Sequence, residues 1–359
     1  MPIQKNGEGR LSQIVEPLLS WYTENKRELP WREDASPYHV WISEIMLQQT
    51  RTTAVIPYYK RFLDELPTVS ALASVSDDCL MKLWEGLGYY SRARNLKRAA
   101  KILVATHGGQ LPDTVQELRA LPGIGEYTAG AIASIAFGRP EPAVDGNVLR
   151  VVMRYLGCSD DVMRPATKKW VSDALRDIYP QGQRAGALTQ AIMELGESIC
   201  IPNGAAGCNS CPLYARCEAR ISERVGELPV RAPKKIRKKE ERTVFLLSCQ
   251  GLYAIRKRPK DGLLAGLWEF PSVPGKLSVG EAAAYIRGLD AQVLFCEPCG
   301  DAIHIFTHIE WHMTGYLVEC AKPLDGFVWE PAQVVLSRYA VPTALRSFLG
   351  VMERDVEKI

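Results

Sequence analysis

A cluster of four cysteines occupies eighteen residues of this chain, at Cys200, Cys208, Cys211 and Cys217. The spacing is C-x7-C-x2-C-x5-C, and four thiolates on one short loop suit zinc or a four-iron four-sulfur cluster. Zinc sites usually contain two separate C-x-x-C pairs, whereas this loop has one pair flanked by two single cysteines. The spacing therefore favours an iron–sulfur cluster over zinc, and over a set of buried structural cysteines.

The remaining composition is that of an ordinary globular protein. The chain has 359 residues, of which 47% are hydrophobic and 24% charged, and these values exclude a disordered or fibrous protein. The length predicts two or three domains. No apolar run is long enough to span a membrane, and the first ten residues lack the apolar core of a secretory signal. We therefore expect a cytoplasmic protein that does not bind membranes.

The sequence changes in character twice. Residues 1–225 have mostly helical apolar spacing, which predicts an all-α domain. Residues 226–242 contain seven Lys or Arg against three Glu together with Pro229 and Pro233, which indicates a basic linker between domains. Residues 243–359 contain short β-rich runs, such as 243–249, 291–296 and 313–320, and one helical candidate near 280–288. This part predicts a smaller α+β domain.

Residues 114–136 predict a helix-hairpin-helix. Thr114 and Glu117 have the spacing of a capping box, and the LPGIG run at 121–125 breaks the first helix before a second one begins. Gly123 and Gly125 allow the backbone to approach a phosphate closely, and the following helix presents free N–H groups to it. Such contacts position a protein on DNA without reading its sequence. The alternative is a helical hairpin that serves only for packing.

Asp145 stands in the PAVDGNVLRV run at 142–151, directly before apolar residues with helical spacing. The simplest interpretation is a helix N-cap, the commonest role of Asp in this setting. A cap site also favours the ionised carboxylate, which could stabilise a cation that develops during a reaction. Capping and catalysis are compatible at this position.

These features together resemble the DNA glycosylase superfamily that includes endonuclease III, and within it the MutY family of adenine-DNA glycosylases. The resemblance extends from about Leu11 to Ser347. It is carried by LPWR (29–32), VWISEIMLQQT (40–50), WEGLGYYSRARNL (84–96), LPGIGEYTAGAI (121–132), VDGNV (144–148) and LWEFP (267–271). It implies a base-excision-repair enzyme of the bacterial nucleoid that removes adenine mispaired with 8-oxoguanine, or with guanine, from double-stranded DNA.

The resemblance also implies how the bond is broken. Tyr127 stands where endonuclease III-like enzymes have the Lys that attacks the sugar, so a glycosylase without strong strand-cleaving activity is expected. Glu44 would protonate adenine, which requires a raised pKa in an apolar pocket. Asp145 would stay ionised beside the oxocarbenium-like sugar, either as an electrostatic partner or as a transient nucleophile. Asn147 and Tyr127 would orient this pair and the attacking water.

Further residues are expected to bind DNA, because adenine has to leave the base stack to react. By resemblance Gln49 inserts into the stack with Thr50 beside it, and Tyr89 wedges next to the opposite base. The adenine pocket is expected to contain Arg27, Leu29, Trp31 and Gln190. The alternative for Tyr89 is an ordinary core aromatic residue.

Residues 243 to about 350 resemble a Nudix-type domain. Gly275 and Glu281 have the first spacing of the Nudix catalytic segment, but the Arg and Glu cluster that should follow is missing. We therefore expect this domain to recognise rather than hydrolyse. By resemblance Phe306, Thr307 and His308 contact the opposite 8-oxoguanine. The alternative is a strand edge without function.

The sequence departs from the family at two places. The first two cysteines are separated by seven residues where the family usually has six, and Thr307 replaces the usual Ser.

Two rival functions remain. They are an endonuclease III-like glycosylase with lyase activity and a non-catalytic protein that binds damaged DNA. We expect a monomer, with protein partners bound, if at all, through the basic linker.

Overall fold

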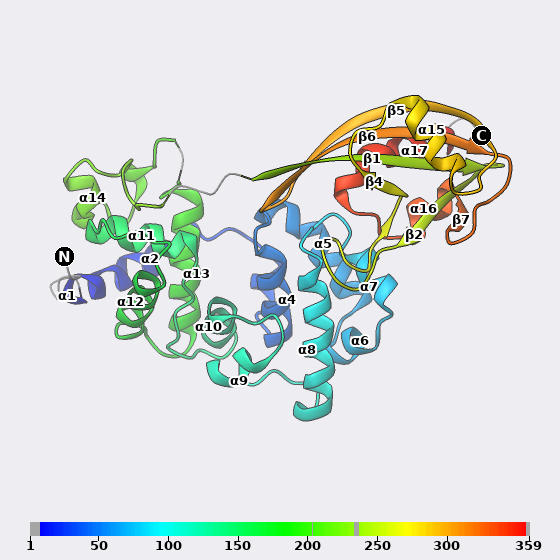
Figure 1. Ribbon diagram of the computed structural model, residues 1–359. Coiled ribbons are helices and arrows are strands. Elements are labelled where there is room, and N and C mark those ends of the chain that lie inside the picture. Colours follow the sequence, from blue (N-terminus) through cyan, green and yellow to red (C-terminus); the bar gives the residue numbers. More distant parts are fainter. Residues whose placement is uncertain (1–7, 203, 233–236, 357–359) are drawn as a thin grey trace. The chain divides into compact units, whose positions relative to one another are not determined.

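The computed structural model describes residues 8–202, 204–232 and 237–356 (Figure 1). The chain divides into two compact units. The first contains Met1–Ser74 and Asn95–Pro233, and the second contains Val75–Arg94 and Lys234–Ile359. The first unit is helical and the second is built on a mixed β-sheet, so the predicted fold class is confirmed. Among the described residues, no helix combines the length and the apolar character needed to cross a bilayer.

The helices of the first unit come from two stretches of the chain, and α8 belongs to it from Asn95 onward. They are α1 (Glu8–Leu11), α2 (Val15–Asn25), α3 (Pro30–Glu33), α4 (Pro37–Leu47), α5 (Thr52–Glu65), α6 (Val69–Ser74), α8 (Ser91–His107), α9 (Val115–Ala120), α10 (Glu126–Ile135), α11 (Gly146–Leu156), α12 (Pro165–Arg176), α13 (Gln183–Ser198) and α14 (Glu218–Ile221), with short 3-10 turns at Ser12–Ile14, Cys208–Ser210 and Tyr214–Arg216.

Helix α13 lies at the centre of the first unit. It contacts α2, α10 and α11, and Figure 1 shows it between them. Its apolar residues Leu188 and Ile192 are fully buried together with Leu18 of α2 and Val152 of α11. Burial of a side chain of this size contributes about 1.5 to 3 kcal/mol. This packing fixes the start of α11, where Asp145 stands.

The predicted helix-hairpin-helix is present as α9 and α10. The Thr114 hydroxyl caps α9 by accepting a hydrogen bond from the Glu117 backbone N–H at 3.3 Å. The Glu117 side chain bonds the Thr114 hydroxyl, which differs from the reciprocal backbone bond of a capping box. Gly123 has φ +82°, and a Cβ there would lie 2.7 Å from the Cβ of Asn95. Only glycine fits this turn.

The second unit contains a seven-stranded sheet whose central path is β3-β2-β1-β6-β5. Strands β1 and β6 are parallel, and β5 and β6 are antiparallel. The elements are α7 (Asp77–Leu83), β1 (Lys238–Cys249), β2 (Leu252–Lys257), β3 (Trp268–Glu269), β4 (Ser272–Pro274), α15 (Val279–Arg287), β5 (Val293–Ile305), β6 (Ile309–Cys320), β7 (Val328–Pro331), α16 (Ala332–Arg338) and α17 (Arg346–Val356), with a 3-10 turn at Thr343–Leu345.

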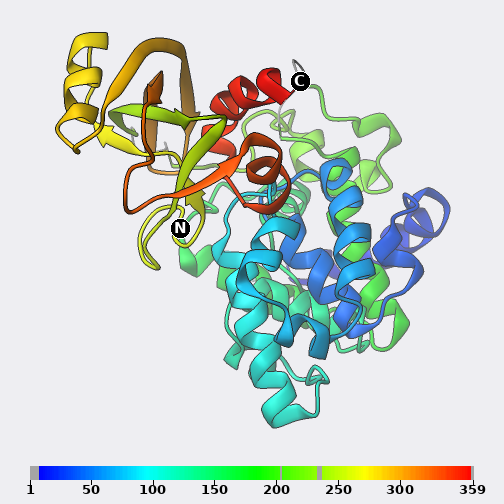
Figure 2. The ribbon, with the colours of Figure 1, turned by 90° about the vertical axis from the view of Figure 1, so that its right-hand side faces the viewer.

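Each face of this sheet is covered by helices. Along β1, Val244 and Leu246 belong to a core with α16 and α17, whereas Phe245 and Leu247 belong to a second core with α15. This alternation follows from the two-residue period of a strand. Figure 2 shows α15 in yellow and α17 in red on opposite sides of the strands.

The predicted boundary between linker and second domain needs correction. Strand β1 begins at Lys238 rather than at residue 243, because Lys238–Arg242 already pair with Ile309–Met313 of β6. The first residues of the strand are exposed or partly exposed, so their charged sequence did not show the alternation of a half-buried strand. Pro233 and residues 234–236 of the predicted linker lie outside the described residues.

The segment Val75–Arg94 is bound to the second unit by several hydrogen bonds. The Lys82 ammonium donates to the carbonyls of Leu336 and Tyr339 at 2.7 and 3.2 Å. The Glu85 carboxylate accepts from the Val341 backbone N–H at 2.9 Å. Tyr89 therefore belongs, through its own segment, to the unit that contains the Nudix-like sheet.

Candidate active site

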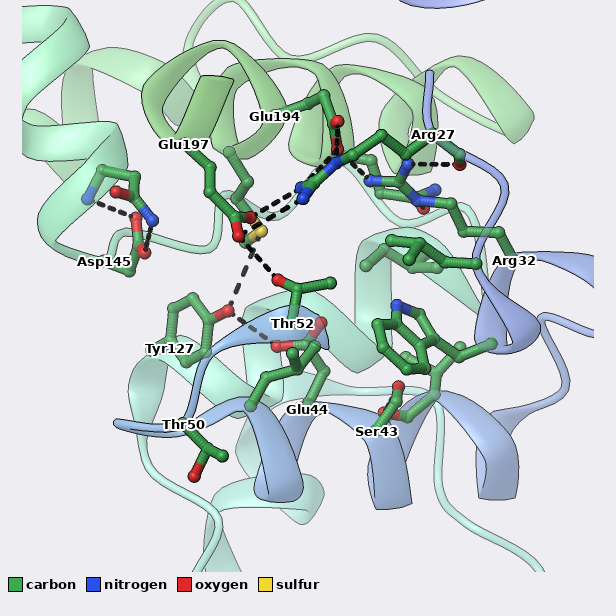
Figure 3. Close-up of a pocket in the computed structure, with 18 residues that line it drawn as sticks. Arg27, Arg32, Ser43, Glu44, Thr50, Thr52, Tyr127, Asp145, Glu194 and Glu197 are labelled. Carbon is green, nitrogen blue, oxygen red and sulfur yellow. Dashed lines mark hydrogen bonds and ion pairs between the residues drawn. The ribbon is translucent and has the colours of Figure 1, made fainter. Parts of the chain in front are cut away.

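A cavity of about 250 Å³ opens in the first unit between α4, α10, α13 and the start of α11 (Figure 3). It brings together residues from five separated stretches of the chain. Nine residues expected at the site line it: Arg27, Leu29, Trp31, Glu44, Thr50, Tyr127, Asp145, Asn147 and Gln190. These nine residues therefore meet in one cavity, and their roles stay predictions.

Glu44 is a carboxyl group on a buried helix. Nearly all of α4 from Tyr38 to Met46 is buried, and Glu44 itself is only 5% exposed. The Tyr127 hydroxyl donates a hydrogen bond to Glu44 Oε2 at 2.7 Å. Burial raises the pKa of Glu44 to about 7, with Asp145 adding to the increase and Tyr127 and Arg32 opposing it. The expected raised pKa is present, so this group exchanges a proton near neutral pH.

Asp145 is the N-cap of α11, as its sequence position predicted. Its Oδ1 accepts from the backbone N–H groups of Asn147 and Val148 at 2.9 and 2.8 Å, and Oδ2 accepts from the Asn147 amide at 2.9 Å. Burial raises the pKa of Asp145, and these donors together with Arg150 lower it. The cap position by itself explains only the stabilisation of the ionised form. The structure adds a burial penalty that acts against it.

Asn147 connects Asp145 to the cysteine loop. The Arg150 guanidinium donates to Asn147 Oδ1 at 2.8 Å and to the carbonyl of Cys200 at 2.6 Å. Arg150 is almost fully buried, so its bonds are shielded from water. The orientation of the Asn147 side chain, which binds Asp145, therefore depends on the position of Cys200.

The other end of the cavity holds the expected Arg27 together with three charged residues for which no role was predicted, Arg32, Glu194 and Glu197. Arg32 Nη2 lies 2.6 Å from Glu194 Oε2, and Arg27 Nη2 lies 2.7 Å from Glu197 Oε2. The Thr52 hydroxyl donates to Glu197 at 2.6 Å. Glu194 is 2% exposed, and a charge so deeply buried is stable only when it is paired.

One signal for these residues was present in the sequence. Gln190, Met193, Glu194 and Glu197 are spaced three and four residues apart on a helix whose other residues are mostly apolar. This spacing places them on one face, where two carboxylates call for nearby cations. Arg32 belongs to the LPWR run, but no role was assigned to it.

Figure 3 shows how the two carboxyl groups lie around Tyr127. Tyr127 extends from the start of α10 into the cavity, and its hydroxyl points toward Glu44. Asp145 lies on the other side of the tyrosine ring in this view. The pKa of Tyr127 is raised first by burial and then by the charges of Glu44 and Asp145, so its hydroxyl stays protonated. Tyr127 is therefore available as a hydrogen-bond donor.

The four cysteines of the loop face one small cavity. It is lined by Arg154, Ile199, Cys200, Cys208, Cys211, Tyr214, Cys217, Arg220 and Val225. Burial, and then the three other thiols, raise the pKa of Cys211 to about 12, while a backbone hydrogen bond lowers it. Arg154 Nη1 lies 3.4 Å from the Cys200 sulfur and would stabilise a thiolate there. The four thiols are thus neighbours with a cation beside them.

Among the described residues, no three His, Cys, Asp or Glu side chains are placed to hold one metal ion directly. Thiolates that each bind a different iron of a cluster stand further apart than thiolates that share one zinc ion. The donor set of four neighbouring thiols fits a cluster of this kind. Asn203, inside the loop, lies outside the described residues.

Two expected DNA-inserting residues lie on exposed turns. Gln49 follows α4 with φ +59°, and Tyr89 has φ +45° and is 47% exposed. Few residues other than glycine adopt such a backbone, and strained positions of this kind cluster at functional sites. Gln49 is not among the residues that line the cavity around Glu44.

The second unit has a cavity of its own, of about 530 Å³. Its lining includes Tyr89, Phe306, Thr307 and His308, all of which were expected to contact DNA. The hydroxyls of Tyr89 and Thr307 lie 3.2 Å apart, which is a hydrogen-bond distance. The alternative of a core aromatic is therefore wrong for Tyr89.

Comparison with known proteins matches both parts of the chain. Residues 42–181 match the model of the HhH-GPD superfamily of base excision DNA repair proteins, and residues 243–350 match the NUDIX domain. The chain is 37% identical over 405 residues to an adenine DNA glycosylase of Rattus norvegicus, covering 94% of this chain and 77% of the relative. The chain belongs to the adenine DNA glycosylase family.

Two further relatives agree with this assignment. The adenine DNA glycosylase of Buchnera aphidicola from Acyrthosiphon pisum is 33% identical, over 86% of each chain. A solved endonuclease III bound to DNA has 25% identity and a TM-score of 0.51, covering 60% of this chain and 97% of that one. As a member of the adenine DNA glycosylase family, the chain is a DNA glycosylase of base excision repair.

Proposed function

We propose that this chain hydrolyses the N-glycosidic bond of adenine that is mispaired with 8-oxoguanine, or with guanine, in duplex DNA. The observation that carries the proposal is the pair of carboxyl groups, Glu44 and Asp145, in one cavity with Tyr127 hydrogen-bonded to Glu44. The named adenine DNA glycosylases among the relatives support adenine as the base.

The two carboxyl groups act at the two ends of the bond that breaks. Glu44, with a pKa of about 7, donates its proton to the purine and makes it a better leaving group. Asp145 carries the negative charge that stabilises the oxocarbenium-like sugar, as in glycoside hydrolysis. Asn147 holds Asp145 in place through its amide, so the carboxylate needs no reorganisation when the charge develops.

The cavity also orients the base. Leu29 and Trp31 provide apolar contacts, and the Arg27 and Arg32 guanidiniums fix Glu194 and Glu197 in the wall of the cavity. Gln190 accepts from Arg32 at 3.1 Å and leaves its amide near the cavity. These groups bind an extruded nucleobase, and Thr50 lies where the chain leaves α4 toward the base stack.

DNA is positioned by the hairpin and by the two exposed turns. Gly123 and Gly125 let the hairpin backbone approach a phosphate, and such contacts do not depend on sequence. Gln49 fills the gap that the flipped adenine leaves. Tyr89 with Thr307 contacts the opposite 8-oxoguanine, and Phe306 and His308 complete that contact.

We also propose that Cys200, Cys208, Cys211 and Cys217 hold a four-iron four-sulfur cluster. Such a cluster would supply a rigid covalent link across the loop. The link would fix the Cys200 carbonyl that binds Arg150, and through Arg150 the amide of Asn147. The four cysteines, with a cluster bound, would thus support the site without contacting the bond that breaks.

The direct test is product analysis on a duplex with one adenine opposite 8-oxoguanine. The expected result is release of free adenine, with strand breaks only after alkali treatment, because no Lys lines the described cavity. Strand breaks in the absence of alkali would instead show a lyase, and no release of adenine would refute the proposed function.

A further inference from the structure

The first part of the basic linker is bound to the helical unit by its backbone. The Leu228 carbonyl accepts from the buried Arg154 at 2.8 Å, and the Val230 carbonyl accepts from the Val162 N–H at 3.1 Å. The Ala232 N–H donates to Asp161 Oδ1 at 3.4 Å. Residues 228–232, which we call the tethered segment, therefore have a defined course over the helical unit.

This course places Arg231 beside the start of α11. A Cβ built on Gly146 would lie 3.7 Å from Arg231 Nη2, and apart from its chain neighbours and its own helix no other atom would lie within 4 Å of it. The Arg231 side chain is exposed, and its charge is close enough to repel Arg150. No carboxylate in the described part of the chain forms an ion pair with it. Among the described residues, Arg231 therefore has no ion-pair partner. It lies beside Gly146, the residue that follows Asp145 directly.

Asp145 does not serve as the missing partner of Arg231. Its two oxygens already accept three hydrogen bonds, from the backbone of Asn147 and Val148 and from the Asn147 amide. The same carboxylate occupies the backbone N–H groups of Asn147 and Val148 in the first turn of α11. An anion at this position would therefore be bound by the guanidinium itself.

The chemistry of the site indicates which anion fits. A nucleotide whose sugar lies against Asp145 has a phosphate on each side of that sugar, a few ångströms away. A guanidinium binds phosphate with two parallel N–H donors and stays charged at every physiological pH. Gly146 has no side chain, so no side chain from this position of the helix covers Arg231 Nη2.

We propose that Arg231 binds one of the two backbone phosphates that flank the target adenosine, so that the tethered segment forms part of the DNA-binding surface. This inference rests on the proposed function, because it needs the target sugar beside Asp145. Arg231 touches no reacting atom and is a positioning residue. It adds a linker residue to the contacts made by the hairpin.

The test compares Arg231→Gln with Arg224→Gln. Arg224 precedes the tethered segment and is already paired with Glu227 at 3.0 Å. Its replacement by Gln therefore changes the net charge of the protein equally but removes no contact to a phosphate. Binding is measured on a duplex with 2′-fluoro-2′-deoxyadenosine opposite 8-oxoguanine. The fluorine of this adenosine analogue prevents cleavage because it destabilises the sugar cation.

Arg231→Gln is expected to weaken binding about eightfold at 0.1 M salt and to reduce the slope of log K against log salt by about 0.9, the effect of one phosphate contact. Arg224→Gln should change the affinity by less than about twofold, as is typical of an exposed ion pair. Equal effects of the two variants, or an unchanged salt slope, would overturn the proposal.

A second measurement identifies the phosphate. Duplexes with a neutral methylphosphonate at the 5′ or the 3′ phosphate of the target nucleotide are bound by wild type and by Arg231→Gln. On one of them wild type should lose about the same eightfold, while the variant loses nothing further. If the affinity of Arg231→Gln fell by the same factor as that of wild type on both methylphosphonate duplexes, the proposal would be overturned.

The proposed function is tested separately on a cleavable adenosine duplex. At saturating enzyme, wild type should release free adenine from this duplex. Failure of wild type to release adenine would refute the proposed function itself. If wild type releases adenine normally but Arg231→Gln binds DNA as tightly as wild type, only the phosphate contact is refuted.

Discussion

The Tyr127 hydroxyl lies 2.7 Å from Glu44 Oε2, although the two residues are 83 positions apart in the chain. Tyr127 comes from the helix that follows the hairpin, and Glu44 from a buried helix near the start of the chain. The hydrogen bond joins the second helix of the helix-hairpin-helix to the carboxyl group that we propose as the acid. Burial raises the pKa of Glu44, and this hydrogen bond lowers it again in part.

The first prediction concerns the pH dependence of Tyr127→Phe. The tyrosine hydrogen bond lowers the pKa of Glu44, so its loss should raise that pKa above about 7. Catalysis needs the protonated acid, and the fall of the single-turnover rate on the alkaline side should therefore move to higher pH. Tyr179→Phe, which changes a buried tyrosine bonded to Thr189, is the control and should leave the profile in place. A shift toward lower pH would contradict this role.

The second prediction concerns stability. The pKa of Glu44 is about 7 in the folded protein and 4.5 in the unfolded chain, so the folded state binds the proton more tightly. Stability is therefore lost as pH rises from about 4.5 to 7. Glu44→Gln, which mimics the protonated acid, should raise the free energy of unfolding at pH 8 by about 3 kcal/mol, at 1.4 kcal/mol per pKa unit.

This gain should shrink toward pH 4.5, where wild-type Glu44 is itself protonated. Urea unfolding at pH 8 and pH 5 measures both values. The same variant should release adenine about a hundredfold more slowly or worse, because general acid catalysis contributes at least that factor. A variant that is less stable than wild type at pH 8 would show that Glu44 is not held against a burial penalty.

The third prediction concerns the cysteine loop. The purified protein should be brown, with broad absorbance near about 400 nm from thiolate-bound iron and sulfide. Cys211→Ala should lower the iron content and the absorbance, whereas Cys79→Ala, at an exposed cysteine outside the loop, should change neither. A colourless protein that contains zinc would exclude the cluster.

The fourth prediction concerns the opposite base. The hydrogen bond between Tyr89 and Thr307 should make their effects on the preference for 8-oxoguanine over guanine non-additive. Tyr89→Phe and Thr307→Ala should each reduce this preference, and the double variant should lose less than the sum by about 1 kcal/mol, the usual value of such a bond. Strictly additive losses in binding to the two duplexes would mean that the two hydroxyls act independently.

The local features of this protein could be predicted from its sequence because their causes are local. Asp145 caps a helix through residues two and three positions ahead of it, and Gly123 makes a turn that a side chain would block. The approximate place of the second domain also followed from the change from helical to alternating patterns. The individual roles came from the family resemblance.

Other features depend on contacts between distant residues. Arg32 and Glu194 stabilise each other across 162 positions, and either residue alone looks like an ordinary surface charge. The segment with Lys82 and Glu85 belongs to the second unit through backbone groups of Leu336 and Val341, which have no sequence signature. The charged start of β1 at Lys238 is a strand because of its partner in β6.

The final prediction concerns Asp145→Asn. The amide keeps the cap and the shape of the cavity but removes the charge that stabilises the sugar cation. It should leave binding to the 8-oxoguanine duplex within about twofold and lower the single-turnover rate of adenine release by about a hundredfold or more. An Asp145→Asn protein that releases adenine at the wild-type rate would contradict the two-carboxyl account.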